Sequence, residues 1–271
     1  LAYHRERRFH HPLDRRVHAW SSGATSASYG PIGSVASTSK VVVFNAGAEN
    51  TNTKSSDYDR GDVRAYIDGT KTVQLRRGDG AGAIQSSHQV VELTGSNWQV
   101  QTGDAVPSPH VPAGGPEAGG TDVAIADVGD VSRAWVYFTW QTNTANLSER
   151  GHRAWLTSPT NLRVQEHAQA TGSKTIRWHV IRNPQIRVRT GAADNQFSTS
   201  LTATISGFTP VVDPASSFAW VQGMTAGSGN THPRDMWQFE LQGASAIALQ
   251  RGYSGAALFY RHFVVELSPS N

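Results

Sequence analysis

Histidine side chains are concentrated in the first twenty residues, where His4, His10, His11 and His18 lie. Imidazole nitrogens are common metal ligands, so this segment is the first place to look for a metal site. A metal site needs ligands that neighbouring groups hold rigidly in place. The segment has too little apolar content to order itself, and the sequence therefore predicts no metal site here.

Carboxylates cluster in a second segment, at Asp57, Asp59 and Asp62. Their oxygens are the hard ligands that Ca²⁺ prefers, but the alternation of ligands and the central glycine of a calcium loop are missing. The same segment contains Arg60-Gly61-Asp62, the tripeptide that integrins bind. Because the arginine recurs along the chain and the aspartate does not, we expect Arg60 to have a role in the fold.

Motifs that carry catalysis are missing from the sequence. It contains no G-x-S-x-G elbow, no phosphate-binding loop, no H-E-x-x-H and no G-x-G-x-x-G after a strand. Carboxylates such as Glu149 and Glu166 are scattered, and no copy of the repeat described below carries an obvious insertion. The sequence also lacks cysteine, which excludes disulfides and thiolate metal sites. We therefore predict no catalytic residue, no cofactor and no enzymatic activity.

One arginine motif occurs three times along the chain. Arg60, Arg150 and Arg234 lie 90 and 84 residues apart, and each precedes a short apolar strand. We expect these arginines to have a structural role, such as pairing a carboxylate at the end of a strand.

A second motif has the same spacing. Val90-Val91-Glu92-Leu93 has a counterpart at Val180-Ile181 and another at Val264-Val265-Glu266-Leu267. Two motifs with one spacing indicate three copies of a single unit. Glu92 and Glu266 are candidate partners of the repeated arginines, although the second copy has Arg182 at this position.

Each copy contains the same series of short strands. Alternation of apolar and polar residues, interrupted by turn residues, is typical of half-buried antiparallel strands. We predict an all-β fold with three tandem small antiparallel β-sandwich repeats and an extended N-terminal arm. The predicted boundaries are residues 1–30 for the basic arm, 31–104 for the first repeat, 105–195 for a linker plus the second repeat, and 196–271 for the third.

A further strand is expected after two of the copies, at Trp98–Gly103 and Ile186–Gly191. The third copy ends at Leu267–Asn271 and lacks such a strand. An open sheet edge invites a strand from another chain. We therefore expect a neighbouring subunit or the N-terminal arm to fill this place.

The basic N-terminal arm carries the whole net charge of the protein. Its first twenty residues have five arginines against two carboxylates, whereas the remaining chain has 19 basic and 19 acidic residues. A neutral body does not resemble a nucleic-acid-binding domain. We expect the arm to contact other subunits through arginine forks and apolar anchors. These contact residues are Arg5, Arg7, Arg8, Phe9, Leu13, Arg15, Arg16 and Trp20.

The repeat resembles units of bacteriophage virion structural proteins, such as tail-fibre and decoration proteins. The resemblance covers about residues 31–267. It rests on the Arg-Gly-x-Val-Arg-Ala strand, the Leu-x-Arg-Gly turn and the closing Val-Val-Glu-Leu with its Val-x-Thr-Gly strand. The second copy departs from it at His179-Val180-Ile181-Arg182. The strand order is also similar to the H-type lectin unit, a six-stranded sandwich that trimerises and binds N-acetylgalactosamine.

These resemblances imply a non-enzymatic structural component of a virion or another extracellular assembly, self-associating through its arm and an open strand edge. Its partners would be copies of itself and other assembly proteins. No run approaches the 18 apolar residues of a membrane span.

The alternative is a carbohydrate-binding, lectin-like adhesion module that binds cell-surface glycans through its repeated polar loops. The candidate ligand residues in these loops are Asp57, Tyr58, Asp59, Asn143, Asn146, Asn230 and His232.

Overall fold

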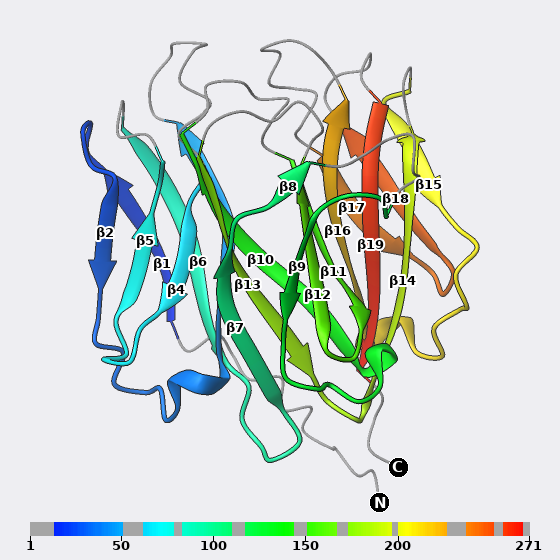
Figure 1. Cartoon of the computed structure of the whole chain (residues 1–271), viewed down its shortest axis with the longest axis horizontal. Coiled ribbons are helices and arrows are strands. Elements are labelled where there is room, and N and C mark those ends of the chain that lie inside the picture. Colours follow the sequence, from blue (N-terminus) through cyan, green and yellow to red (C-terminus); the bar gives the residue numbers. More distant parts are fainter. Residues whose placement is uncertain are drawn as a thin grey trace, which may run out of the picture.

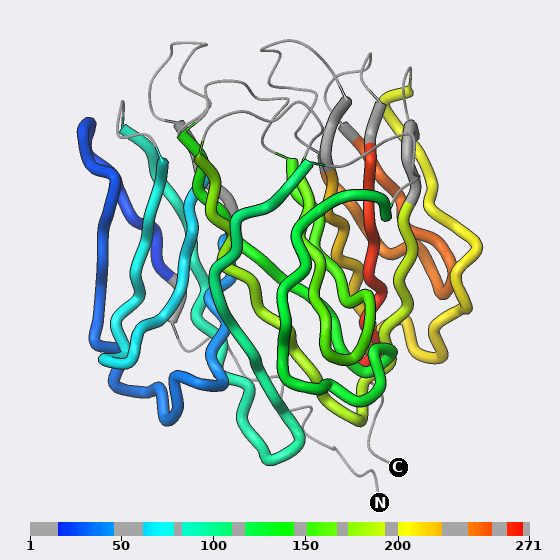
Figure 2. Tube along the Cα trace, viewed as in Figure 1, coloured from blue at the N-terminus to red at the C-terminus, as the bar shows by residue number. Residues whose placement is uncertain are grey.

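The protein is an all-β chain whose strands form six small sheets (Figure 1). The computed structural model describes residues 14–50, 62–78, 83–109, 117–143, 151–166, 173–196, 200–226, 237–251 and 257–267. The sheets group into three consecutive pairs, which we call the first, second and third sheet pairs. The three follow one another from the blue to the red end of the chain (Figure 2).

The first sheet pair contains six strands. They are β1 (Asp14–Trp20), β2 (Ser26–Tyr29), β3 (Val41–Asn50), β4 (Arg64–Ile67), β5 (Val73–Arg76) and β6 (Ile84–Glu92). One sheet has the order β1-β6-β3 and the other the order β2-β5-β4, and all pairings are antiparallel.

The second sheet pair has the same arrangement with one addition. Its strands are β7 (Gln99–Ala105), β8 (Ser108–Pro109), β9 (Thr121–Ala124), β10 (Ala134–Thr142), β11 (His152–Ser158), β12 (Asn161–Glu166) and β13 (Lys174–Arg182). One sheet has the order β10-β13-β7. In the other, β12 pairs with β11 and β9, and the short β8 joins β12 in a parallel pairing.

The third sheet pair repeats the order of the first. Its strands are β14 (Ile186–Gln196), β15 (Thr202–Ile205), β16 (Ser217–Ala226), β17 (Trp237–Gln242), β18 (Ala246–Arg251) and β19 (Ala257–Leu267). The two sheets have the orders β14-β19-β16 and β15-β18-β17.

Each pair encloses apolar side chains from both of its sheets. Along β5, Val73 and Leu75 are buried while Gln74 and Arg76 are partly exposed, as the alternating sequence requires. The cluster of the second pair is the largest. It extends to Val42 of β3 and Val265 of β19, so that side chains from all three pairs share one core.

A short 3₁₀ helix precedes the corresponding strand in every pair. These helices are η1 (Thr38–Lys40), η4 (Val131–Arg133) and η6 (Pro214–Ser216). Asp130 and Asp213 cap the last two, because their side chains accept hydrogen bonds from the backbone N–H groups of Ser132 and Ala215.

The first strands of the first and third pairs differ from what the sequence led us to expect. Residues 14–20 of the expected arm form β1, which pairs with β6. The strand at residues 186–196 pairs with β19 rather than closing the second copy. The third pair therefore has a strand at the place that we expected to be open.

In two of the three first strands, a glycine lies opposite a ring of the central strand. Gly103 of β7 lies opposite Trp178 of β13, and a Cβ atom on the glycine would be 2.5 Å from the indole ring. Gly191 of β14 lies opposite His262 in the same way, with 2.8 Å to the imidazole. The Thr-Gly motif thus makes room for a ring on the central strand.

The Pro/Gly-rich segment at residues 105–120 also differs from the expected linker. It lies between β7 and β9, inside the second sheet pair, and it contributes β8 to that pair. The corresponding connections span residues 21–25 in the first pair and 197–201 in the third. The second pair therefore does carry an insertion.

Candidate functional site

Trp20 and Arg16 of the predicted contact arm lie in β1. Trp20 is buried in the core of the first pair, and its Nε1 donates a hydrogen bond to Ser86 Oγ at 2.8 Å. Arg16 is exposed, with its guanidinium 4.9 Å from the ring centre of Tyr29. Trp20 is therefore a core residue rather than an anchor on a neighbour. Of the other arm residues, Arg5, Arg7, Arg8, Phe9 and Leu13 lie outside the described residues, as does the side chain of Arg15.

Glu92 and Glu266 hold the segments that lead into the 3₁₀ helices. Glu92 accepts hydrogen bonds from the backbone N–H groups of Ala36 (3.0 Å) and Ser37 (2.6 Å). Glu266 likewise accepts from Val212 (2.7 Å) and Asp213 (3.1 Å). The repeated glutamate thus has a structural role in satisfying backbone donors.

Arg189 of β14 provides a charged partner for Glu266, at 2.9 Å. Burial raises the pKa of Glu266, but the hydrogen bonds from Arg189 and the two N–H groups outweigh burial and lower it. The predicted arginine partners Arg60, Arg150 and Arg234 lie outside the described residues.

The candidate ligand loops are flanked by strand ends that lie together. Each pair has one of these loops at the same place. The loops connect β3 to β4, β10 to β11, and β16 to β17. These strand ends lie at the upper end of the molecule in Figure 1. The candidate residues Asp57, Tyr58, Asp59, Asn146, Asn230 and His232 lie outside the described residues.

Asn143 is the one candidate ligand residue that the structure describes. It is exposed, its Oδ1 accepts a hydrogen bond from Ser173 N at 2.7 Å, and its N donates to Ser173 O at 3.2 Å. The side-chain oxygen of Asn143 therefore ties two connections of the second pair together.

The first and second sheet pairs meet where β4 packs on β10 and β13, a contact that we call the first seam. The backbone N–H of Ala65 donates to Thr139 Oγ1 (3.0 Å), and this hydroxyl donates to the Ala65 carbonyl (3.2 Å). Asp104 of β7 forms ion pairs with Arg64 (3.0 Å) and Arg177 (3.5 Å).

The ring of Tyr66 lies close to both guanidinium groups of the first seam. Its ring centre is 5.4 Å from Arg64 and 4.9 Å from Arg177. A cation over an aromatic ring contributes about 0.5–2 kcal/mol, more as water is excluded. The seam is therefore held by hydrogen bonds, ion pairs and cation–π contacts together.

The second and third pairs meet where β11 packs on β16, a contact that we call the second seam. It repeats the first. The N–H of Ala154 donates to Gln222 Oε1 (2.7 Å), and Arg261 lies 4.5 Å from the ring centre of Trp155. Thr139 and Gln222 are each the sixth residue of their strand, so both seams use the same positions.

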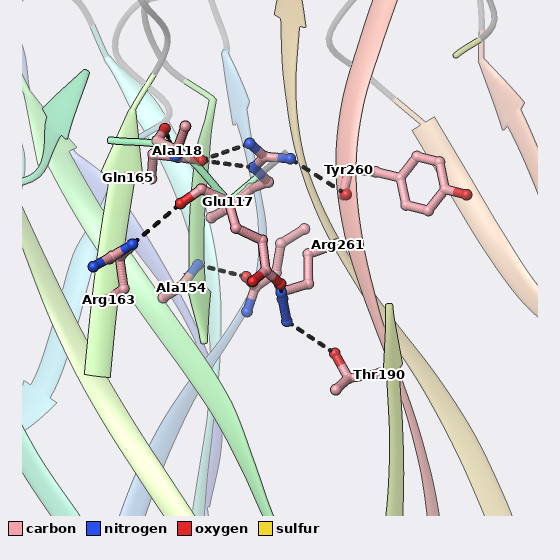
Figure 3. A network of polar contacts seen from close by, with 10 residues as sticks. Glu117, Ala118, Ala154, Arg163, Gln165, Thr190, Tyr260 and Arg261 are labelled. Carbon is pink, nitrogen blue, oxygen red and sulfur yellow. Dashed lines mark hydrogen bonds and ion pairs between the residues drawn. The ribbon is translucent and has the colours of Figure 1, made fainter. Parts of the chain in front are cut away.

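Arg153 is the most buried cation of the second seam, with an exposed fraction of 0%. Its Nε and Nη2 donate to Gln165 Oε1 (3.1 and 2.6 Å), and its Nη1 reaches the Tyr260 carbonyl of the third pair at 3.5 Å (Figure 3). Gln165 in turn donates to the carbonyl of Ala118 at 2.7 Å.

The insertion between β7 and β9 also reaches the second seam. Its Glu117 carboxylate pairs with Arg261, which donates to Thr190 Oγ1 at 3.3 Å (Figure 3). The Glu117 carbonyl accepts from Arg163 at 3.2 Å. Hydrogen bonds from Arg163 to Asp122 lower the pKa of Asp122 to about 2, so this carboxylate stays charged.

Equivalent aromatic residues meet between the seams. The ring of Tyr137 is 4.6 Å from Phe44 of the first pair and 5.1 Å from Trp220 of the third. Burial raises the pKa of Tyr137 well above its ordinary value, only partly offset by the N–H of Asn45, which donates to its hydroxyl at 2.7 Å. Next to this ring, burial and the nearby Arg177 lower the pKa of His179 to about 3.

The interior of the second pair contains an unexpected ion pair. Lys174 Nζ lies 2.9 Å from Glu166 Oε2, and both side chains are buried. His152 is the strand partner of Glu166 and is also buried. This layer lies at the end of the pair where the ligand loop begins. Sequence analysis missed it, although all three polar residues occupy inward-facing positions of alternating strands.

The residues of the two seams hold neighbouring sheet pairs in place. The arginines of both seams are placed by carboxylates, amides, carbonyls and aromatic rings, and they fix one sheet pair against the next. Within the described ranges, no group of three or more His, Asp or Glu residues is placed to hold a metal ion. No helix among the described residues is long and apolar enough to cross a membrane.

The fold and the two seams show that the chain is an all-β protein with sandwich-like sheet pairs. Comparison with models of protein families gave no match, and neither did comparison with curated proteins.

Proposed function

We propose that this chain is a non-enzymatic recognition module of an extracellular or virion-surface assembly, and that its ligand is a glycan. The observation that carries this proposal is the common orientation of the three sheet pairs. Each has the same strand order, and the strand ends that flank the candidate ligand loops lie at one end of the molecule (Figure 1). Three sets of strand ends at one end of the molecule allow three binding sites on one chain, which favours multivalent binding.

Three tandem β-sandwich repeats are part of the same proposal. The shared strand order, the repeated glutamate cap and the repeated seams support a single unit that occurs three times. This arrangement is what the H-type lectin resemblance implies, with three fused units in place of a trimer. Rigid seams favour a binding platform because a preorganised surface loses less entropy when it binds.

A glycan array with purified protein tests the proposal. We expect saturable binding to a subset of glycans, reduced at least tenfold when Asp57, Asp59, Asn146 and Asn230 are replaced by alanine together. Lys40→Gln, on the 3₁₀ helix before β3, is the matched control and should bind normally. Absence of saturable binding by the folded protein would overturn the proposal.

A structural, self-assembling role is the second candidate function. It is favoured by β1, an edge strand on which Val17 is 64% exposed. Exposed edge strands can pair with another chain. Sedimentation velocity separates the two candidates, because a structural component should form large oligomers without glycan, whereas the binding module should remain a monomer.

A further inference from the structure

The third sheet pair exposes apolar side chains around its 3₁₀ helix. Val212, just before η6, is 80% exposed, and Phe218, shortly after it, is 36% exposed. Pro214 is exposed as well, and we call these three residues the η6 patch. Val42 and Trp135 have the position of Phe218 in the other two pairs, and both are buried. The other two pairs therefore cover a position that the described residues leave partly open in the third.

In the first and second pairs, the first strand of the next pair provides part of this cover. The strand β14 packs on β10 and η4, and β7 lies against η1. Val100 of β7 and Val188 of β14 belong to the same apolar cluster as Val42 and Trp135. The first strand of one pair thus contributes to the core beside the 3₁₀ helix of the preceding pair.

A cation on each of these two helices also holds the backbone of the segment beside it. Lys40 Nζ of η1 donates to the Gly95 carbonyl, and Arg133 Nη1 of η4 donates to the Ile186 carbonyl, both at 2.7 Å. The contact between a 3₁₀ helix and the chain that enters the next first strand therefore occurs twice, with the same kind of hydrogen bond.

The remaining first strand is β1, and the residue expected to make this contact precedes it. Asp14 has the register position of Gln101 in β7 and of Arg189 in β14. Leu13 therefore has the position of the two valines named above. It belongs to the thirteen residues that precede β1.

The first and third pairs come close enough for such a contact. The ring centres of Phe44 in the first pair and Trp220 in the third are 4.6 and 5.1 Å from that of Tyr137. Asp14 lies in the same sheet as Phe44, two strands from Val43. Thirteen extended residues span up to about 43 Å, so the segment before β1 is long enough to reach the η6 patch.

We propose that the N-terminal segment, residues 1–13, docks on the η6 patch of the same chain, with Leu13 covering Phe218. Phe9 and Leu13 give this segment large apolar side chains that suit an exposed apolar patch. Residues 268–271, which follow β19, are Ser-Pro-Ser-Asn and have no large apolar side chain. The segment then joins the first pair to the third, whatever the loops bind.

The reactivity of a single introduced thiol tests the proposal, because the sequence has no cysteine. The variant Leu13→Cys is compared with Val17→Cys, since residues four apart share one face of a strand and Val17 is 64% exposed. We expect a maleimide reagent to modify Leu13→Cys at least tenfold more slowly, because the docked segment must open first. Equal rates in the two folded variants would overturn the proposal.

A second substitution shows whether the η6 patch provides the protection. Val212→Asp places a charge in the patch at an exposed position, and we expect it to raise the modification rate of Leu13→Cys at least fivefold. Leu201→Asp, also in the third pair and 50% exposed in the natural protein, is the matched control and should leave the rate unchanged. If Val212→Asp has no more effect than Leu201→Asp, the proposal fails.

Dilution distinguishes the segment of the same chain from that of a second copy. We expect the modification rate of Leu13→Cys to stay the same after hundredfold dilution of the protein, because docking within one chain does not depend on concentration. Protection that disappears on dilution would assign the patch to the segment of another copy and overturn the proposal. Because no glycan is present, either outcome leaves the proposed function to its own test.

Discussion

The interiors of the first and second sheet pairs solve the same packing problem with different chemistry. At the loop end, the first pair places the apolar Val63 and Ile84, both buried. The second pair has His152 and Lys174 at the corresponding strand positions, with Glu166 beside them. In the first pair, Arg77 takes the position of Glu166 and is 2% exposed. Both pairs therefore bury charge at this level, but the first has apolar residues where the second has His152 and Lys174.

The first pair also contains a neutral hydrogen-bond network. Trp20 Nε1 donates to Ser86 Oγ, and Ser86 Oγ also bonds His88 Nε2, both at 2.8 Å. A buried ion pair often stabilises a protein no more than apolar residues of similar volume, because both charges lose their hydration. The ion pair of the second pair is therefore not expected to stabilise the fold more than apolar residues of similar volume would.

The largest expected effect comes from breaking the ion pair on one side. Lys174→Met leaves the buried Glu166 carboxylate without the ammonium group 2.9 Å away. We expect the free energy of unfolding to fall by about 3–5 kcal/mol. Urea denaturation followed by tryptophan fluorescence measures this change.

Removing both charges is the matched control for that variant. Lys174→Met with Glu166→Met replaces both partners of the ion pair, and we expect stability within about 1 kcal/mol of the natural protein or above it. If the double variant is as unstable as Lys174→Met alone, the ion pair itself holds the fold, and the comparison fails.

The second expected effect, intermediate in size, is a loss of stability in acid that arises from His179 of the second pair. The pKa of His179 lies at about 3 in the folded protein, because of burial and the nearby Arg177, and near 6.5 in the unfolded chain. The unfolded state then binds more protons, so stability is present above pH 6.5 and is lost as the pH falls toward 3.

His179→Phe tests this assignment, because the third pair has Phe263 at the same position. One histidine accounts for about 1.4 kcal/mol per pH unit in this window. The variant should therefore resist acid better than the natural protein by about 2 kcal/mol at pH 5, as measured by urea denaturation at pH 5 and pH 7. If the free energy of unfolding differs between pH 5 and pH 7 by the same amount in the variant and in the natural protein, His179 does not titrate on unfolding.

Much of the fold was predictable from local patterns. Alternation along segments such as Val73–Arg76 and Ile84–Glu92 predicted an all-β chain with antiparallel strands, and this is confirmed. The partner of each first strand was not predictable in the same way. Alternation shows that Ile186–Gly191 is a strand, but it does not show that its partner is β19, in which His262 lies opposite Gly191 across 71 residues.

The contacts at the two seams could not be predicted from local sequence patterns either. Arg177 and Arg261 are separated by more than a hundred residues from Tyr66 and Trp155, respectively. Their shared role follows only from the packing of one sheet pair on the next. Glu92 and Glu266 were predicted to be structural partners of the repeated arginines, whereas their described partners are backbone N–H groups and, for Glu266, Arg189, which the sequence does not single out.

The smallest expected effect is in the neutral network of the first pair. Ser86→Ala removes the hydroxyl shared by Trp20 and His88 while the surrounding apolar core remains. Losing one buried neutral hydrogen-bonding group costs about 1–2 kcal/mol, less than the loss of a charged partner. Urea denaturation should therefore rank Ser86→Ala clearly above Lys174→Met in stability. The reverse order would mean that the neutral network, and not the ion pair, is the more sensitive of the two interiors.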